Sequence, residues 1–303
     1  MALVTNALVQ ALFTGFKADF QKALEAAPSH YMGVATVVPS TTKSNTYGWL
    51  GNLQDLREWV GDRVINDIKE HGYQIVNKDW ESSVGVKRTD IEDDEVGVYT
   101  PLVQEIGRTA AVHPDKLVFE LLKAGISTNC YDGQFFFDTD HPVYANADGT
   151  GANTPTANFD NNGGAGTPWY LLDTSRAIKP LIFQQRKKPV FTSMTKLDDE
   201  QVFTANEFRF GVDCRDNVGF GFWQMAYCSR KDLNGTNLNA AITAMQEFVA
   251  DGGRPLGINP TLLVVPPSLR EAALETVKAE RNAAGATNIN RNAVEVLVTP
   301  WVK

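Results

Sequence analysis

The stretch that decides the fold is TDIEDDEVGVYTPLVQEIGRTAAVHPDKLVFELLKAG, residues Thr89–Gly125. Its acidic start predicts the beginning of a helix, because Thr89 and Glu92 have the spacing of a capping box and negative charge is favoured at a helix N-terminus. Apolar residues then recur every three or four positions, which predicts one buried helical face: Val96, Tyr99, Val103, Ile106 and Ala110. We expect a kink or a restart at Pro101 and at Pro114. Gly125 marks the C-terminal end of this helical region. Residues 89–125 are therefore predicted as one long helix or two nearly collinear ones.

An amphipathic helix is predicted at the N-terminal end, over residues 5–27. Its apolar residues recur every four positions: Leu8, Leu12, Phe16, Phe20 and Leu24. Pro28 follows, which predicts the end of the helix there. A single helix with such an apolar stripe has to bury it. The partner is either the rest of the same chain or a neighbouring subunit.

The middle of the chain mixes helix and strand signals. Residues 47–70 have a helical pattern, whereas residues 73–88 alternate with period two and have no purely apolar face. We interpret residues 73–88 as a two-stranded ribbon that projects from the body and needs a partner surface. Residues 145–167 are rich in glycine and asparagine, which predicts an exposed, mobile loop. Residues 169–217 are predicted as short strands separated by prolines such as Pro189.

The last third has the pattern of an α/β unit. Residues 236–250 are predicted as a helix and residues 261–265 as a buried strand. A second capping-box spacing, Ser268 with Glu271, predicts the start of another helix. Residues 294–298 return as a strand, so the strand–helix–strand order predicts two parallel strands joined by a right-handed crossover. Taken as a whole, the fold class is α+β.

Composition limits the classes of function. A chain of 303 residues has room for about two domains. The net charge is −8, and the densest basic run, Gln185–Lys188, carries only three charges, which argues against sequence-specific DNA binding. The first residues lack the pattern of a secretory signal. The cysteines Cys130, Cys214 and Cys228 are far apart, which predicts reduced, buried thiols and neither a disulfide framework nor a zinc site.

The sequence carries few candidates for chemistry. It contains no phosphate-binding loop, dinucleotide fingerprint, nucleophile elbow or His-Glu-x-x-His zinc motif. The best local candidate is Asp138, Asp140 and His141, because two carboxylates and an imidazole can bind a divalent metal or relay a proton. The favoured interpretation of these three residues is a polar turn after a strand, since nothing nearby supplies further ligands. We therefore expect no catalytic, cofactor-binding or metal-binding residue.

The order of these elements resembles that of the major capsid proteins of tailed phages. The chain is most similar in pattern to the Mu-like major head subunits, the gene product T family. The resemblance extends over nearly the whole chain and rests on the order and spacing of individually weak motifs. These motifs are Arg88, Ile91–Asp94, Gly107–Ala111, Leu117–Gly125, Tyr131–Pro142, Trp169–Arg176 and Leu262–Leu269.

This resemblance implies the Hong Kong 97 capsid fold and a structural, non-enzymatic function. The chain is expected to assemble with copies of itself, as hexamers and pentamers, into an icosahedral shell around packaged double-stranded DNA. Scaffold, maturation protease and portal proteins are the other expected partners, and the expected locations are the virion capsid and, during assembly, the host cytoplasm. The implied parts are an N-terminal arm (1–30), a segment leading into the peripheral domain (31–60), an extended β-hairpin loop (60–92), the peripheral domain (90–232) with a spine helix (90–125), an axial domain (233–293) and a C-terminal strand (294–303).

Two alternatives remain open at the level of the sequence. An encapsulin-type nanocompartment would use the same shell fold for a different cargo. A metal-dependent hydrolase would use Asp138, Asp140 and His141 as its active site.

Overall fold

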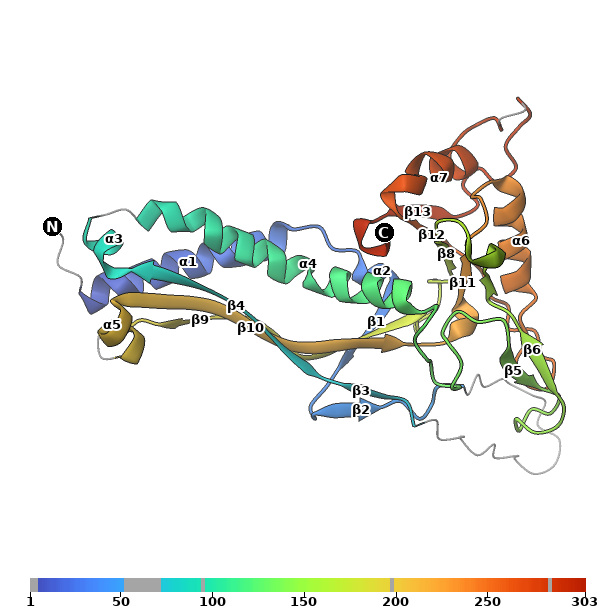
Figure 1. The fold of residues 1–303 in the computed structure, drawn as a ribbon, viewed down its shortest axis with the longest axis horizontal. Coiled ribbons are helices and arrows are strands. Elements are labelled where there is room, and N and C mark those ends of the chain that lie inside the picture. Colours follow the sequence, from blue (N-terminus) through green and yellow to red (C-terminus); the bar gives the residue numbers. More distant parts are fainter. Residues whose placement is uncertain (1–4, 52–71, 94–95, 197–198, 283–284) are drawn as a thin grey trace.

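The longest helix, α4 (Thr100–Ala124), joins the two halves of an elongated molecule (Figure 1). The structure is a computed structural model, and it describes residues 5–51, 72–93, 96–196, 199–282 and 285–303. One half is an arm in which α4 lies on long strands, and the other half is a smaller sheet flanked by helices (Figure 1). No helix of the described residues is long and apolar enough to cross a membrane.

The elements follow in mixed order along the chain. The other described helices are α1 (Asn6–Ala26), α2 (Tyr31–Val34), α3 (Arg88–Glu92), α5 (Glu200–Ala205), α6 (Gly235–Gln246) and α7 (Arg270–Val277). Short 3-10 turns are η1 (Val96–Tyr99), η2 (Asn162–Gly164), η3 (Trp223–Met225), η4 (Pro267–Leu269) and η5 (Pro300–Val302). The strands are β1 (Ala35–Pro39), β2 (Ser44–Thr46), β3 (Gln74–Val76), β4 (Lys78–Lys87), β5 (His141–Tyr144), β6 (Asn153–Thr156), β7 (Phe159–Asp160), β8 (Trp169–Leu172), β9 (Leu181–Met194), β10 (Glu207–Phe220), β11 (Ala226–Ser229), β12 (Leu262–Val265) and β13 (Glu295–Val298).

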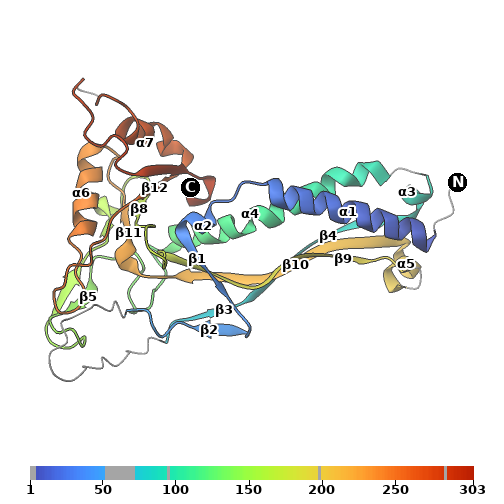
Figure 2. The ribbon, with the colours of Figure 1, turned by 180° about the vertical axis from the view of Figure 1, so that it is seen from behind.

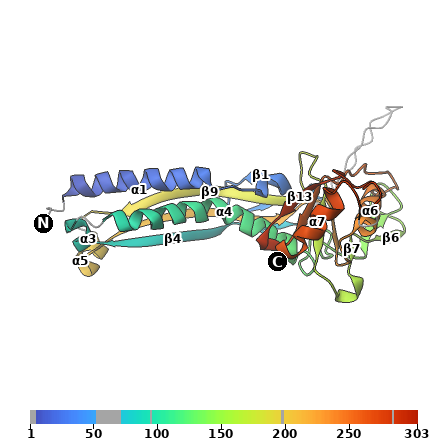
Figure 3. The ribbon, with the colours of Figure 1, turned by 90° about the horizontal axis from the view of Figure 1, so that it is seen from above.

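The arm is built on a four-stranded sheet with the order β1-β9-β10-β4. Helices α1 and α4 run side by side along one face of its long strands (Figures 2 and 3). Side chains alternate along β10, so Phe208, Phe210 and Val212 point to the helices and are buried. Ring centroids lie 5.1 Å apart for both Phe16–Phe210 and Phe20–Phe191. The apolar stripe of α1 is therefore buried against its own chain.

The predicted N-terminal helix is confirmed as α1, with a small shift of its buried face. Thr5 is the N-cap, and its side chain accepts a hydrogen bond from the Leu8 N–H at 3.2 Å. Val9 is fully buried, whereas Leu8 is 39% exposed, so the stripe that packs inward differs by one residue from the one expected in the first turn. The helix ends at Ala26, two residues before Pro28.

The region 90–125, predicted as one long helix or two nearly collinear ones, contains two described α-helices, and only the second is long. Helix α3 begins at Arg88 with Lys87 as N-cap, and Glu92 pairs with the Arg88 guanidinium at 3.1 Å instead of closing a capping box with Thr89. The capping-box prediction is therefore wrong. Helix α4 begins only at Thr100, with a proline in its first turn, and continues through Pro114 to Ala124.

The second sheet has the order β13-β12-β8-β11-β7 and forms the other half of the molecule. The predicted parallel pair is confirmed, because β12 pairs with β13 in parallel and α7 lies between them in the chain. The second capping box is wrong: α7 follows the 3-10 turn η4, and its N-cap, Leu269, has no side-chain cap. Strands from before and after residue 232 share this sheet, so the boundary predicted at 232/233 runs through it.

Helix α4 contributes to two separate cores. In its first half, Val103 belongs to the core between the helices and the long sheet. In its second half, Phe119 and Leu122 belong to the larger core, which also contains Trp169 and Val264 of the second sheet. Residues near the C-terminus, in η5, pack against α4 as well. This helix is thus the structural link along the molecule.

The ribbon predicted over residues 73–88 has different pairing in the structure. Strand β3 pairs with β2, and β4 pairs along its whole length with β10, so the two do not form a hairpin with each other. The described start of the predicted helix 47–70, residues 47–51, is a turn, and the rest, 52–71, lies outside the described residues. The same holds for the first part of the predicted extended loop 60–92, whose described part is β3, β4 and α3.

Two further sequence features behave differently from expectation. Pro189 does not end a strand but lies within β9, where the register with β10 shifts and forms a β-bulge. The loop 145–167 is mostly exposed, as predicted, but it contains the short strands β6 and β7. Within it, Asn158 is fully buried, and its amide donates to the carbonyl oxygen of Phe136 at 2.8 Å.

Candidate functional sites

A buried polar group closes the loop that follows α4. The His141 ring is fully buried, and its Nδ1 lies 2.7 Å from Oδ2 of Asp132. The Cys130 thiol donates to Oδ1 of Asp132 at 3.0 Å, and the Gln134 N–H donates to the same oxygen at 3.1 Å. Burial disfavours the charged carboxylate, but the hydrogen bonds from His141 and Cys130 outweigh it, so the pKa of Asp132 is lowered. The His141 ring also stacks on Trp223, with centroids 4.1 Å apart.

The three residues predicted as the best chemical candidate do not converge. Asp138 accepts hydrogen bonds from the N–H groups of Phe135 and Thr139, at 3.2 and 2.7 Å, so it shapes a turn. Asp140 is exposed, and its pKa is raised by partial desolvation and by the charge of Asp138. His141 is instead hydrogen-bonded to Asp132 in the interior. The turn interpretation is therefore the one that the geometry supports.

Sequence reasoning missed Cys130 and Asp132 as partners of His141. Their atoms lie within 4.8 Å of one another, and this donor set is one that zinc can use. In the structure, however, the thiol and the imidazole are both hydrogen-bonded to the Asp132 carboxylate. The ring nitrogen that has no described partner is Nε2 of His141, which is not the atom that faces Asp132. The arrangement thus closes a loop rather than presenting a reactive centre.

A second buried polar group ties α4 to the long sheet. Nε2 of His113 lies 3.1 Å from Oδ1 of Asp216, and the Trp80 ring packs against the His113 ring at 4.8 Å. Cys214 lies beside them, and burial followed by the charge of Asp216 raises its thiol pKa to about 12. A thiol with this pKa is protonated at neutral pH and is a poor nucleophile or metal ligand. All three cysteines are buried and free, as predicted.

The linker between α1 and α2 is fixed by one buried carboxylate on α4. Oδ1 of Asp115 accepts hydrogen bonds from the Ser29 hydroxyl at 2.9 Å and from the Tyr31 N–H at 2.7 Å. The His30 N–H donates to both carboxylate oxygens at 2.9 Å. Asp115 is only 4% exposed, so these donors compensate its burial. The direction in which α1 leaves the body is set by this contact.

A buried amide network connects β9 to the strands β2 and β3. Gln184 is fully buried; its Oε1 accepts a hydrogen bond from the Tyr47 hydroxyl at 2.8 Å, and its Nε2 donates to Oδ1 of Asn77 at 2.8 Å. The Asn77 amide in turn donates to the Ser40 hydroxyl at 2.9 Å. Burial raises the pKa of Tyr47 to about 12, so the phenol stays neutral and keeps its proton for the bond to Gln184. The network attaches Tyr47, which precedes the segment 48–72, and Asn77, which follows it, to Gln184 of β9.

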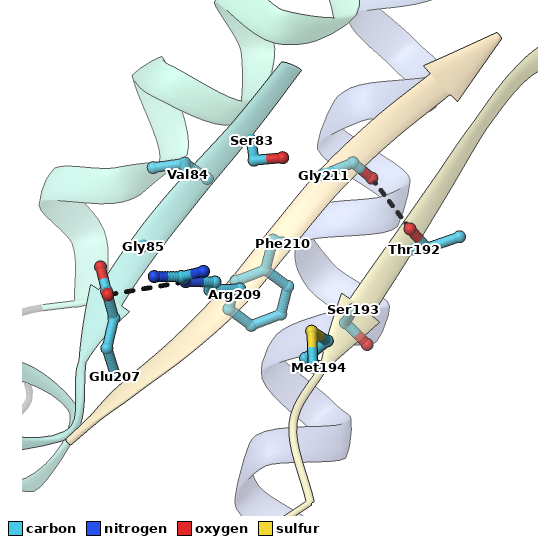
Figure 4. Close-up of a pocket in the computed structure, with 10 residues that line it drawn as sticks. All are labelled: Ser83, Val84, Gly85, Thr192, Ser193, Met194, Glu207, Arg209, Phe210 and Gly211. Atoms are coloured by element: carbon cyan, nitrogen blue, oxygen red, sulfur yellow. Dashed lines mark hydrogen bonds and ion pairs between the residues drawn. The ribbon is translucent and has the colours of Figure 1, made fainter. Parts of the chain in front are cut away.

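The face of the long sheet opposite α1 carries a shallow hollow of about 480 Å³ (Figure 4). It is lined by Ser83, Val84, Gly85, Thr192, Ser193, Met194, Glu207, Arg209, Phe210 and Gly211. A Cβ atom on Gly211 would lie 2.8 Å from the Ser83 hydroxyl oxygen. Any larger residue at this position would therefore fill part of the hollow. Glu207 and Arg209 form an ion pair of 3.8 Å at its rim (Figure 4). The Ser83 hydroxyl donates to the carboxylate of Glu81, on the same strand, at 3.0 Å.

Large apolar side chains remain exposed in several places. Phe203, on α5 at the far end of the arm, is 87% exposed, and Ile289, between α7 and β13, is 84% exposed. Val98, in η1, is 63% exposed. Apolar side chains that are exposed singly are common on soluble proteins, so these three residues alone do not define an interface.

An elongated body with two cores, in which the buried polar groups close loops or join elements, has the features of a structural subunit. The chain belongs to the family of Mu-like prophage major head subunits, gpT, whose model matches residues 9–302. It is 50% identical over 289 residues to the major capsid protein of Escherichia phage Mu, covering 95% of each chain. It is 52% identical over 285 residues to the FluMu major head subunit of Haemophilus influenzae, covering 93% of this chain and 92% of that one.

Solved capsid structures agree with this family. The chain matches a subunit in the procapsid of bacteriophage JBD30 with a TM-score of 0.88 and 60% identity, covering 98% of this chain and all of that one. It matches a subunit in the JBD30 capsid with a TM-score of 0.76 and 46% identity, covering both chains completely. The expected capsid fold and the major head subunit function are confirmed by these matches. The encapsulin alternative is not favoured, because the matched family and relatives are phage and prophage head subunits.

Proposed function

We propose that the chain assembles as hexamers and pentamers into an icosahedral head shell that encloses double-stranded DNA. The observation that carries the proposal is the match of the whole arm and second sheet to a JBD30 procapsid subunit. The acidic net charge of −8 suits a container whose wall must not bind the packaged polymer tightly. Scaffold, maturation protease and portal proteins are the proposed partners during assembly in the host cytoplasm.

The parts of the capsid fold are proposed with boundaries adjusted to the elements. Helix α1 is the N-terminal arm, α4 is the spine helix, and the long sheet with α4 forms the peripheral domain. The axial domain comprises α6, α7 and the strands that flank them. We propose no enzymatic activity, no cofactor and no metal site, because the buried carboxylates Asp132, Asp216 and Asp115 each close a loop or join elements.

Co-expression with the scaffold and protease genes from the same genome tests the proposal. Closed shells in electron micrographs, with this chain as the major component, are the expected result. Soluble subunits without shells under these conditions would refute it. The variant Asp140→Ala tests the enzyme alternative: assembly should be unchanged, because Asp140 is exposed, whereas Asp138 is half-buried and accepts two backbone hydrogen bonds.

A further inference from the structure

The long sheet of the arm has two edges that differ in how much backbone they leave unpaired. Strand β4 is one edge, and its residues Lys78–Lys87 pair only with β10. Strand β9 is covered by β1 only over Leu181–Gln185, so its residues 186–194 form the free part of the other edge. Among the described residues, no backbone hydrogen bond joins the outer side of β4 to any other segment. Figure 3 shows β4 along one border of the arm.

The free part of β9 is protected against pairing by its own residues. It begins with Arg186, Lys187 and Lys188, and it contains Pro189, which has no N–H to donate. Charged side chains, proline and bulges are the usual means by which edge strands avoid pairing with other chains. The bulge between β9 and β10 lies at the same place.

Strand β4 has this protection only in its first four residues and at its last one. Residues 82–86, SSVGV, contain no proline and no charged side chain, and the charged residues of the strand are Lys78, Asp79, Glu81 and Lys87. The ten residues of β4 extend over about 33 Å, and every second residue directs its N–H and C=O outward. A long, regular and unprotected edge is a template for a further strand.

The chemistry beside β4 suits a polypeptide partner. Its charged residues balance, with Lys78 and Lys87 against Asp79 and Glu81, so the edge attracts neither a polyanion nor a strongly charged peptide. On the face that carries the hollow, the Glu207 side chain covers Gly85, and Ser83 is a small, exposed residue of the strand.

We propose that in the assembled shell β4 accepts a strand from a second copy of this chain, which extends the long sheet from one subunit into the next. The partner is a copy because, in a shell built from one major subunit, the lateral borders of each subunit face other copies. This inference rests on the proposed assembly, but its test is separate, because shell formation and strand pairing are measured independently.

Amide hydrogen exchange of soluble subunits and of shells tests the pairing. We expect the peptide covering Lys78–Lys87 to exchange at least about tenfold more slowly in the shell, since its outward N–H groups gain acceptors. The peptide covering residues 186–194 of β9 is the internal control and should change little. Equal exchange of β4 in subunits and shells would overturn the proposal, and so would equal protection of both edges, which indicates burial without pairing. Protection of β4 only in shells that also contain scaffold or a minor protein would assign the strand to that protein instead.

A matched pair of variants gives a second, independent measurement. Ser83 on β4 and Thr192 on β9 flank Gly211 in the register, and both are exposed on the same face. Ser83→Lys introduces a charge beside the unprotected edge, so we expect soluble subunits with a loss of closed shells. Thr192→Lys places the same charge near the edge that is already protected, and shells should form normally. Closed shells from Ser83→Lys in the same yield as from Thr192→Lys would overturn the proposal.

Discussion

Replacement of Gly107 by alanine should loosen the docking of α1 on α4. A Cβ atom at Gly107 would lie 2.5 Å from the carbonyl oxygen of Phe20 and 3.0 Å from the Cβ of Ala23. An ordinary van der Waals contact begins at 3.4 Å, so the α1 backbone would have to retreat by about 0.9 Å. Overpacking of this kind costs about 1–3 kcal/mol, while alanine gains about 1 kcal/mol in helix propensity. The net expectation is a destabilisation of about 1 kcal/mol, although glycine is the poorer helix former.

Gly15 provides the matched control because it is also inside a helix. It is exposed on α1, and a Cβ atom there would meet no other atom within 4 Å. Gly15→Ala should therefore stabilise the subunit by up to about 1 kcal/mol, from helix propensity alone. Urea unfolding of the soluble subunits, followed by circular dichroism, measures both changes. If Gly107→Ala is as stable as wild type or more stable, while Gly15→Ala behaves as expected, the close approach of the two helices is not what requires glycine.

Three further changes test the buried polar groups. Asp115→Asn should destabilise the subunit by about 2 kcal/mol in urea unfolding, because an uncharged amide is a weaker acceptor for the N–H donors of the linker; an unchanged midpoint would show that these bonds are dispensable. Gln184→Met should cost about 2 kcal/mol by leaving Tyr47 and Asn77 without their partner, and a double mutant with Tyr47→Phe should cost clearly less than the sum of the single changes. The pKa of Asp132 is lowered in the folded state, so its contribution is fully present above the ordinary carboxyl pKa of about 4 and is lost as the pH falls through the lowered value. Asp132→Asn should therefore flatten the acid limb of the stability–pH curve, and an identical limb in the variant would contradict the assignment.

Helix and strand positions could be predicted from the sequence wherever the apolar residues of one buried face recur in a regular local pattern. The period of four in α1 and the apolar run of β12 are of this kind, and both elements form as expected. The motif that begins at Gly107 was recognised only as part of a family pattern. Glycine is needed at position 107 because the α1 backbone at Phe20 lies against it, and these two residues are more than eighty positions apart in the sequence. No local pattern contains that information.

The errors concern choices between local and long-range partners. Thr89 and Glu92 have capping-box spacing, but Glu92 pairs with Arg88 because the chain leaves β4 directly into the helix. Residues 73–88 alternate like a hairpin, yet β4 finds its partner in β10, more than a hundred residues later. Pro189 has the signal of a strand end, but the bulge and the free edge at that position remove the need for its N–H.

The partners of the candidate chemical residues could not be predicted from the sequence, because they also depend on how the chain folds. Asp138, Asp140 and His141 are neighbours in the sequence, and the fold separates the imidazole from the two carboxylates. Its actual partner, Asp132, lies nine residues earlier with Cys130, a spacing that matches no common motif. A pattern of nearby polar residues therefore indicated the loop but not the direction of its side chains.

The burial of α1 has a consequence for the synthesis of the protein. Phe210 packs against Phe16 of α1. It lies 190 residues after Phe20, the last aromatic residue of that helix. At about 5–20 residues per second, a ribosome needs on the order of 10–40 s to add that length. During this time the aromatic side of the first helix has no strands of its own chain to cover it. Nascent chains on one polysome can therefore stick to each other before any of them is complete, and a chaperone that holds apolar helices would act on the first thirty residues.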